Sequence, residues 1–213
     1  MTTTTAAARE RSAFSDLLDE VGPDAPTLCE GWTTRDLAAH VVIRERRPDA
    51  AAGVVIKKLA GHTDKVQAST ASAPWSELVD TVRTGPPRWS PTRLGAVERV
   101  ANTIEFFVHH EDVRRAQEPW EPRVLPDDLA DDLYAALKRM IKLLGRSSPT
   151  GLVLEPTDGR EPIVAKNGSP SVTARGPVGE LVLFLYGRQA RARVELDGEP
   201  ASVEAVRAAS FGI

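Results

Sequence analysis

The longest uninterrupted helical pattern in the chain is the feature that most restricts its fold. Apolar residues recur at intervals of three or four from about Pro91 to Gln117, which predicts one long helix. Three further segments show the same spacing: about Thr5 to Val21, Thr33 to Pro48, and Leu129 to Leu144. A long polar connection rich in proline and glycine, Gly61 to Pro91, separates the second helix from the third. Four amphipathic helices with one long connection predict a four-helix bundle.

Local signals set the expected ends of these helices. Gly22 and Pro23 stop the first helix, and Gly145 ends the fourth. Thr33 and Asp36 resemble a capping box at the start of the second helix, with Asp in place of the usual Glu. Pro48 predicts an end or a kink, after which residues 49–60 can resume a helix. Within the long connection there is one short helical candidate, Trp75 to Val82.

The pattern changes after Ser147. β-forming residues alternate or cluster at 151–156, 162–165 and 171–175, between turn dipeptides such as Asp158-Gly159, which predicts strands. We then expect an apolar helix from Pro177 to Gly187, a strand from Ala190 to Leu196 and a terminal helix from Ser202 to Ala209. The sequence therefore predicts an α+β chain with two domains: a four-helix bundle of residues 1–147 and a small α/β domain of residues 148–213.

Composition excludes several classes of protein and of site. With 41% hydrophobic and 27% charged residues, the chain is typical of globular proteins. A net charge of −3 without a basic stripe disfavours nucleic acid and anionic membranes as partners. There is no apolar run of the roughly 20 residues that cross a bilayer, and the N-terminus lacks a signal-peptide pattern, so we expect a cytoplasmic protein. The single cysteine, Cys29, cannot form an intrachain disulfide, so a metal site would rest on His and carboxylates. The oligomeric state is left open.

Glu105 and His109 lie four residues apart in the long helix. This spacing puts both side chains on one face, with Cβ atoms about 5–6 Å apart, as in the helical motif of metalloproteases. Such a pair is usually a surface ion pair, but here Ile104, Phe106, Phe107 and Val108 flank the carboxylate. A lone buried carboxylate is costly unless it is paired or coordinated, so the apolar setting favours a metal ligand.

His40 in the second helix is the candidate third ligand. It stands among apolar residues, where the alternative is a hydrogen-bonded core histidine. Two imidazoles and one carboxylate suit Zn²⁺, Ni²⁺ or Fe²⁺, and three protein ligands leave coordination positions open, as catalytic sites do. The sequence thus predicts a metal site formed by His40, Glu105 and His109.

Other polar residues near these ligands have two interpretations each. Asp112 is either a hydrogen-bond acceptor that orients His109 or the partner of Arg114 or Arg115. Arg44 and Arg47 follow His40 by four and seven residues, and either bind an anion at the same cavity or lie on a solvated face. The remaining candidates have simpler interpretations: Asp36 as a cap, His110 on the flank of its helix, His62 in solvent, and Cys29 as a small buried hydrophobic residue.

Two motifs resemble the mycothiol-dependent maleylpyruvate isomerase family, one of the DinB-like metal-binding four-helix bundles. They are residues 28–40, LCEGWTTRDLAAH, and residues 105–116, EFFVHHEDVRRA. Residues 172–188 resemble the small α/β domain, sterol-carrier-like in some members, that is appended to these bundles. The resemblance implies a metal, generally zinc, held by His40, Glu105 and His109. Residues 44–50 look like a subgroup described only as metal-binding, which leaves the substrate open.

The resemblance implies an enzyme with mycothiol as thiol cosubstrate and a small electrophile as substrate. As an isomerase, it would add the thiolate to an activated cis double bond and eliminate it after rotation; as a transferase, it would release the conjugate. Arg188 and Arg175 are candidates to hold a substrate carboxylate, and no catalytic residue is assigned. The alternatives are a non-catalytic metal-dependent module for a small molecule or lipid, suggested by the apolar run from Leu181 to Leu185, and a metal that only pins helices together.

Overall fold

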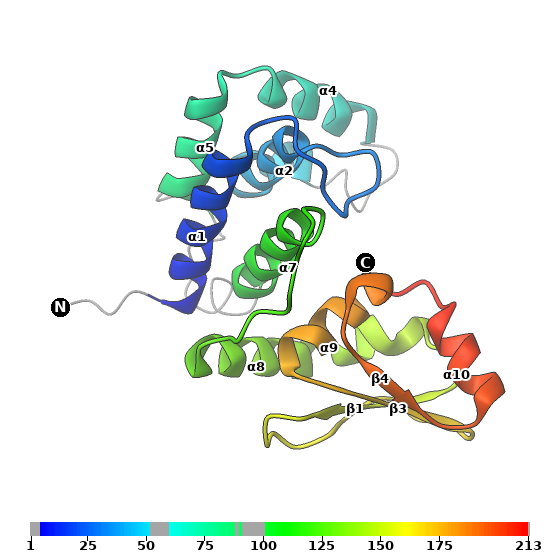
Figure 1. The fold of residues 1–213 in the computed structure, drawn as a ribbon. Coiled ribbons are helices and arrows are strands. Elements are labelled where there is room, and N and C mark those ends of the chain that lie inside the picture. The colour runs from blue at the N-terminus through cyan, green and yellow to red at the C-terminus, as the bar shows by residue number, and fades with distance from the viewer. Residues whose placement is uncertain (1–4, 52–59, 88–89, 91–100, 213) are drawn as a thin grey trace. The chain divides into compact units, whose positions relative to one another are not determined.

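The computed structural model describes residues 5–51, 60–87, 90 and 101–212 (Figure 1). The chain forms two compact units, Met1–Trp120 and Glu121–Ile213. None of the described helices has the length and hydropathy needed to span a membrane.

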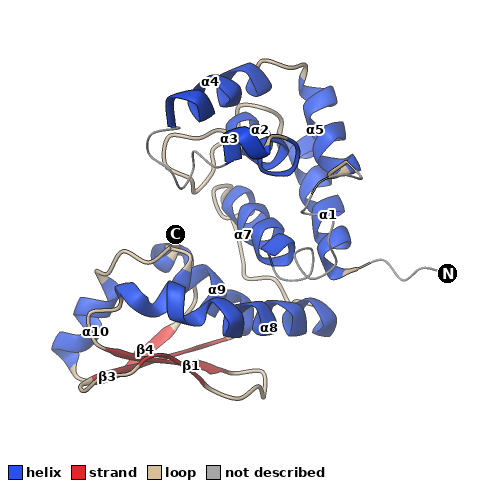
Figure 2. Ribbon diagram, turned by 180° about the vertical axis from the view of Figure 1, so that it is seen from behind, coloured by secondary structure: helices blue, strands red, loops and turns tan. Residues whose placement is uncertain are grey.

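The first unit is helical. Its described helices are α1 (Ala6–Val21), α2 (Thr34–Arg46), α3 (Pro48–Ala51), α4 (Ala60–Ala71), α5 (Trp75–Thr84) and α7 (Thr103–Arg114), as Figure 2 shows. Helix α1 contacts α5 and α7, and α2 contacts α4 and α5. One core joins four of these helices and consists of Phe14, Leu18, Leu37, Ala38, Val41, Val42, Leu78, Val79, Val82, Phe106 and Val113.

The predicted helix ends of α1 and α2 are confirmed. The Thr5 side chain accepts a hydrogen bond from the backbone of Ala8 at 3.2 Å at the start of α1. Gly22 follows α1 with a φ of 78°, a left-handed conformation that favours glycine. Thr33 and Asp36 form the capping box of α2, in which the Thr33 N–H donates to Asp36 Oδ2 at 3.0 Å. These caps fix where α2 begins and therefore where His40 lies along it.

The polar connection contains more helix than the sequence predicts. The candidate at Trp75 is confirmed as α5, but residues 61–71, expected to be irregular, belong to helix α4. Helix α4 has few apolar residues, and Val66 is the one that joins a small core with Ile43 and Ala50. Without an apolar stripe, a helix gives no signal in the spacing of hydrophobic residues. The predicted helical residues 91–100 and 52–59 lie outside the described part of the chain.

The second unit contains a helix, a small sheet and two further helices. Its elements in order are α8 (Asp127–Leu144), β1 (Gly151–Pro156), β2 (Ile163–Lys166), β3 (Ser171–Gly176), α9 (Val178–Leu185), β4 (Glu195–Asp197) and α10 (Pro200–Arg207). The strand order is β2-β1-β3-β4, with β1 and β3 parallel and the two outer pairs antiparallel. Helix α8 contacts α9 and β2. The last strand begins at Glu195, later than predicted, because Gln189–Arg191 form a turn of 3₁₀-helix.

Helix α8 takes a different role from the one that the sequence predicts. It shares its unit with the sheet, whereas the fourth helix in the core of the first unit is α5. Both helices are amphipathic, and amphipathicity does not reveal which partner an apolar face meets. The predicted domain boundary between residues 147 and 148 stays a prediction.

Gly145 at the end of α8 shows how closely this helix approaches the sheet. A Cβ at this position would lie 2.7 Å from the Ala165 carbonyl oxygen of β2. Only a residue without a side chain permits this approach of helix and strand. The glycine read from the sequence as a helix stop therefore also has a packing role.

The apolar helix α9 is part of the core. All eight residues of Val178–Leu185 are buried, and α9 contacts α8, β1 and β3. The apolar run from Leu181 to Leu185, which suggested a lipid-binding role, is therefore used for packing within the unit.

Candidate metal centre

The three predicted ligands meet between two helices of the first unit. His40 comes from α2, and Glu105 and His109 come from α7. One carboxylate oxygen, Glu105 Oε1, lies 3.3 Å from His40 Nε2 and 3.1 Å from His109 Nε2. The two imidazole rings meet edge to face with their centroids 5.4 Å apart. The structure thus brings together residues that are 65 positions apart in the chain.

Packing on both helices aims these side chains at one another. Leu37, Ala38 and Val41 are fully buried around His40, so α2 cannot rotate without exposing them. The Trp32 ring contacts His40, with 5.3 Å between the two ring centroids. On α7, Phe106 joins the same core as these α2 residues. The ligand geometry therefore follows from the packing of apolar neighbours.

The spacing of the donor atoms fits one small divalent cation. A donor atom from each of the three residues lies within 4.8 Å of the other two. A tetrahedral ion with ligand distances of about 2.1 Å needs donors about 3.4 Å apart. The two separations from Glu105 Oε1, 3.3 and 3.1 Å, are close to this value. The residues therefore fit a metal, although binding itself stays a prediction.

Glu105 is an anion in this environment. Burial alone would raise the pKa of its carboxyl group, but the positive charge of Arg44 and the hydrogen bonds with His109 and His40 outweigh burial. The net effect holds the pKa of Glu105 well below its usual range. The carboxylate is therefore charged at neutral pH and attracts a cation to the space between the imidazoles.

The pKa of His109 shifts in the opposite direction, upward. Burial alone would lower the pKa of its imidazole, but hydrogen bonding to Asp112, Cys29 and Glu105 raises it well above the ordinary value. A raised pKa means that protons compete with a metal for this ring up to a higher pH than at an ordinary histidine.

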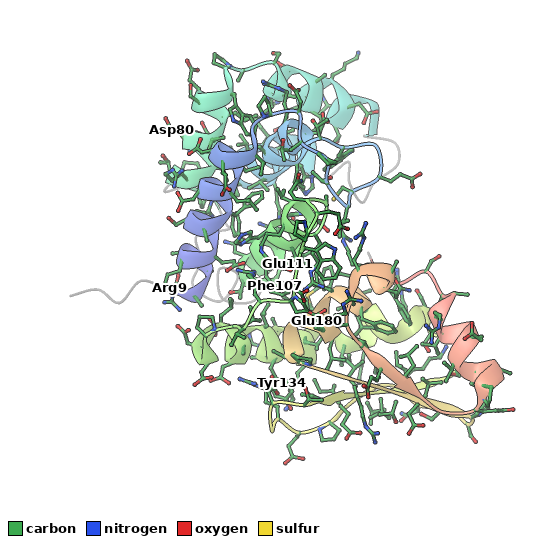
Figure 3. All side chains as sticks on the ribbon, in the orientation of Figure 1. Arg9, Asp80, Phe107, Glu111, Tyr134 and Glu180 are labelled. Atoms are coloured by element: carbon green, nitrogen blue, oxygen red, sulfur yellow. The ribbon has the colours of Figure 1, made fainter. Side chains whose placement is uncertain are left out.

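Asp112 contacts His109 on the side of the ring opposite Glu105. Its Oδ2 atom lies 3.0 Å from His109 Nδ1, and its side chain is 0% exposed. This contact is the hydrogen bond of the first interpretation of Asp112, and an orienting role for this residue stays a prediction. Arg114 and Arg115 contact the neighbouring Glu111, which Figure 3 labels on α7. An acceptor at Nδ1 keeps a proton there and leaves Nε2 available as a ligand.

Cys29 is the residue that the sequence interpretation missed. Its Sγ atom lies 3.2 Å from Asp112 Oδ2, so the thiol belongs to the hydrogen-bonded group around His109. Cys29, His109 and Asp112 form a second set of donor atoms within 4.8 Å of one another. The sequence held no signal for this contact, because Cys29 is 83 residues from Asp112 and lies in a loop.

The predicted anion-binding arginines lie in different places. Arg44 Nε is 3.5 Å from Glu105 Oε1, and Arg44 Nη1 donates to Asn102 Oδ1 at 2.8 Å, so this guanidinium borders the centre. Arg47 is exposed and pairs with Asp49 at 2.8 Å. In the second unit, Arg188 donates to the Tyr186 carbonyl and Arg175 pairs with Glu155. A substrate-binding role for Arg44, Arg47 and Arg188 stays a prediction.

The two other histidines have partners of their own. His110 is buried on the flank of α7, with its Nδ1 atom 2.8 Å from Glu10 Oε1 of α1. His62 lies at the surface 3.0 Å from Asp49. Both positions agree with what the sequence predicts for them.

Comparison with solved structures links most of the chain to one fold. The crystal structure of the mycothiol-dependent maleylpyruvate isomerase superposes with a TM-score of 0.61 at 18% identity, covering 91% of each chain. The chain has the fold of this isomerase. A histidine-to-alanine variant of the isomerase gives the same TM-score at 17% identity and the same coverage. No family model and no curated protein matches the sequence. At this identity the likeness is one of fold, and it agrees with the resemblance read from the sequence motifs.

Proposed function

We propose that the chain is a metal-binding, mycothiol-dependent enzyme that acts on a small electrophilic substrate. The divalent metal, zinc in the first instance and nickel or iron otherwise, is held by His40, Glu105 and His109. The observation that carries this proposal is the position of Glu105 Oε1 between two imidazole Nε2 atoms, at 3.3 and 3.1 Å. The isomerase fold supports mycothiol as the thiol, because the enzyme with that fold is mycothiol-dependent.

The three ligands have distinct tasks in this proposal. Glu105 supplies one negative charge, and the two histidines supply neutral Nε2 atoms. When bound, the metal lowers the pKa of a coordinated thiol, so a thiolate is available at neutral pH without a protein cysteine. Three protein ligands leave a coordination position for such a thiol, whereas structural zinc sites are almost always closed by four.

Arg44 is the residue best placed to hold the substrate. Its guanidinium borders Glu105 and is 20% exposed, and its hydrogen bond to Asn102 fixes its direction. A second anion, such as a substrate carboxylate, can bind the remaining N–H donors of the same fork.

Two reactions follow from a thiolate placed beside an electrophilic alkene. In the isomerase reaction, the sulfur forms a bond to one alkene carbon and the π electrons move toward the activating carbonyl. Rotation about the new single bond and loss of the thiolate then restore the double bond in the trans form. In the transferase reaction, a proton is added to the adduct instead, and the thioether is the product. The geometry does not select between the two reactions.

The experiment that tests the proposal measures metal and thiol dependence separately. We expect close to one divalent metal per purified wild-type chain and loss of that metal in His40→Ala and His109→Ala. His62→Ala is the matched control, because His62 is a surface histidine of the same unit and should leave the metal content unchanged. Wild-type protein that cannot be loaded with metal would refute the site.

Thiol dependence is then tested on protein substituted with cobalt. Addition of a low-molecular-weight thiol should change the visible spectrum of the cobalt protein, and turnover of an activated cis alkene should require the thiol. A loaded protein that responds to no thiol would favour the alternative, a non-catalytic metal-dependent binding module.

A further inference from the structure

Cys29 and His109 share a single acceptor atom. Asp112 Oδ2 lies 3.2 Å from Cys29 Sγ and 3.0 Å from His109 Nδ1. A carboxylate turns readily about its last torsion, whose preferences are broad. Two donors that converge on one oxygen hold that oxygen toward the ring.

The loop that carries Cys29 is fixed by other contacts. The Leu28 N–H donates to the Asp112 carbonyl at 3.0 Å, so the loop is tied to α7 through the backbone. Thr27 Oγ1 accepts from the Cys29 N–H at 3.1 Å and donates to the Trp32 carbonyl at 2.9 Å. These contacts hold the loop without the thiol, so the hydrogen bond from Cys29 to Asp112 is not explained by loop order.

We propose that Cys29 is a positioning residue for the metal centre and acts through Asp112. Its S–H holds Asp112 Oδ2 in place to accept the His109 Nδ1 proton, which fixes the ring orientation and leaves Nε2 directed at the space shared with His40 and Glu105. This inference rests on the proposed metal site.

The competing interpretation is that Cys29 binds the metal itself. Cys29 Sγ, His109 Nδ1 and Asp112 Oδ2 are close enough to hold an ion. A neutral imidazole that binds a metal through Nδ1 carries its proton on Nε2. In that state Nε2 cannot bind a metal together with His40 and Glu105. A thiolate–cobalt bond produces an intense near-ultraviolet charge-transfer band, which separates this possibility from positioning.

The test is a mutant cycle on the full-length chain with the dissociation constant for zinc or cobalt as readout. Competition with a chromophoric chelator gives this constant for wild type, Cys29→Ala, Cys29→Ser, Asp112→Asn and the double variant Cys29→Ala with Asp112→Asn. Loss of an outer hydrogen-bonding partner lowers metal affinity about 10- to 100-fold, and we expect Cys29→Ala near the lower end. Cys29→Ser keeps a donor and should restore most of the affinity.

The double variant decides whether Cys29 acts through Asp112. We expect Cys29→Ala to cause no further loss of affinity once Asp112 is Asn, since interacting residues are not additive. Additive losses in the double variant would overturn the proposal. Thr27→Val, which loosens the same loop without touching Asp112, is the control and should not reproduce the Cys29→Ala effect. If it does, loop order and not the thiol is responsible.

The remaining outcomes separate this inference from the proposed function. A cobalt spectrum with a thiolate charge-transfer band that Cys29→Ser removes would overturn positioning in favour of direct ligation. Wild-type protein that binds metal, loses it in His40→Ala and is indifferent to Cys29 would refute the positioning role alone. Wild-type protein that binds no metal would refute the proposed function itself.

Discussion

Replacing Glu105 by Gln tests the charge at the centre without a change of shape. The carboxylate is anionic, 23% exposed, and 3.5 Å from Arg44 Nε. Two unit charges at this distance attract each other by about 4 to 5 kcal/mol at an effective dielectric constant near 20. Desolvation of both groups offsets most of this attraction, so we expect Glu105→Gln to lower the free energy of unfolding of the metal-free protein by about 1 to 2 kcal/mol.

The pH dependence of this loss has a definite sign. Because the pKa of Glu105 is lowered in the folded state, its contribution is fully present above the unfolded pKa, about 4.3 for glutamate. It is lost as the pH falls through the lower, folded pKa. The difference in stability between wild type and Glu105→Gln should therefore be largest at neutral pH and shrink below about pH 4.

Urea unfolding of chelator-treated protein at several pH values measures this difference. The matched control is Asp19→Asn, which removes a carboxylate from an exposed ion pair with Arg83 in the same unit. Exposed pairs contribute about 0 to 1 kcal/mol, so the control should be close to wild type. If Glu105→Gln is as stable as wild type at pH 7, or if its deficit grows in acid, then Glu105 is not the charged group described above.

Two further predictions concern proton competition and packing. Because the pKa of His109 is raised, protons compete with a metal for its ring, so the dissociation constant should fall as the pH rises, by up to about tenfold per pH unit, and level off once the ring has lost its second proton. A flat profile between pH 5.5 and 8, measured by chelator competition, would contradict the protonated ring. Gly145→Ala forces a Cβ to within 2.7 Å of the Ala165 carbonyl and should destabilise the second unit by about 1 to 3 kcal/mol. Thermal unfolding followed by circular dichroism measures this loss, and an unchanged midpoint would show that α8 moves away from β2 without penalty.

Much of the local structure could be read from the sequence because local signals act over a few residues. The capping box at Thr33 and the glycine at position 22 satisfy backbone groups within one helical turn, so they mark helix ends wherever the helix later packs. The strands between residues 151 and 176 follow from short β-forming runs between turns. Helix α4 was missed because a mostly polar helix carries no periodic signal.

The candidate site was predictable in part for the same reason. Glu105 and His109 share a face because four residues make about one helical turn, which requires no knowledge of the fold. That His40 lies 3.3 Å from Glu105 depends on the packing of α2 beside α7 in a common core. The sequence therefore identifies His40 as a candidate ligand, and only the packing of the helices shows that it lies close to Glu105.

Most of the helices, the approximate positions of the strands, the three candidate ligands and the apolar neighbours of Glu105 could be read from the amino-acid sequence. The tertiary structure decided that α5 completes the core of the first unit, that α8 packs against the sheet, and that the Cys29 thiol meets Asp112. The physical reason is the range of the interactions. Helix periodicity and caps act over a few positions, whereas the partner of an apolar face or of a loop thiol depends on residues far away in the chain.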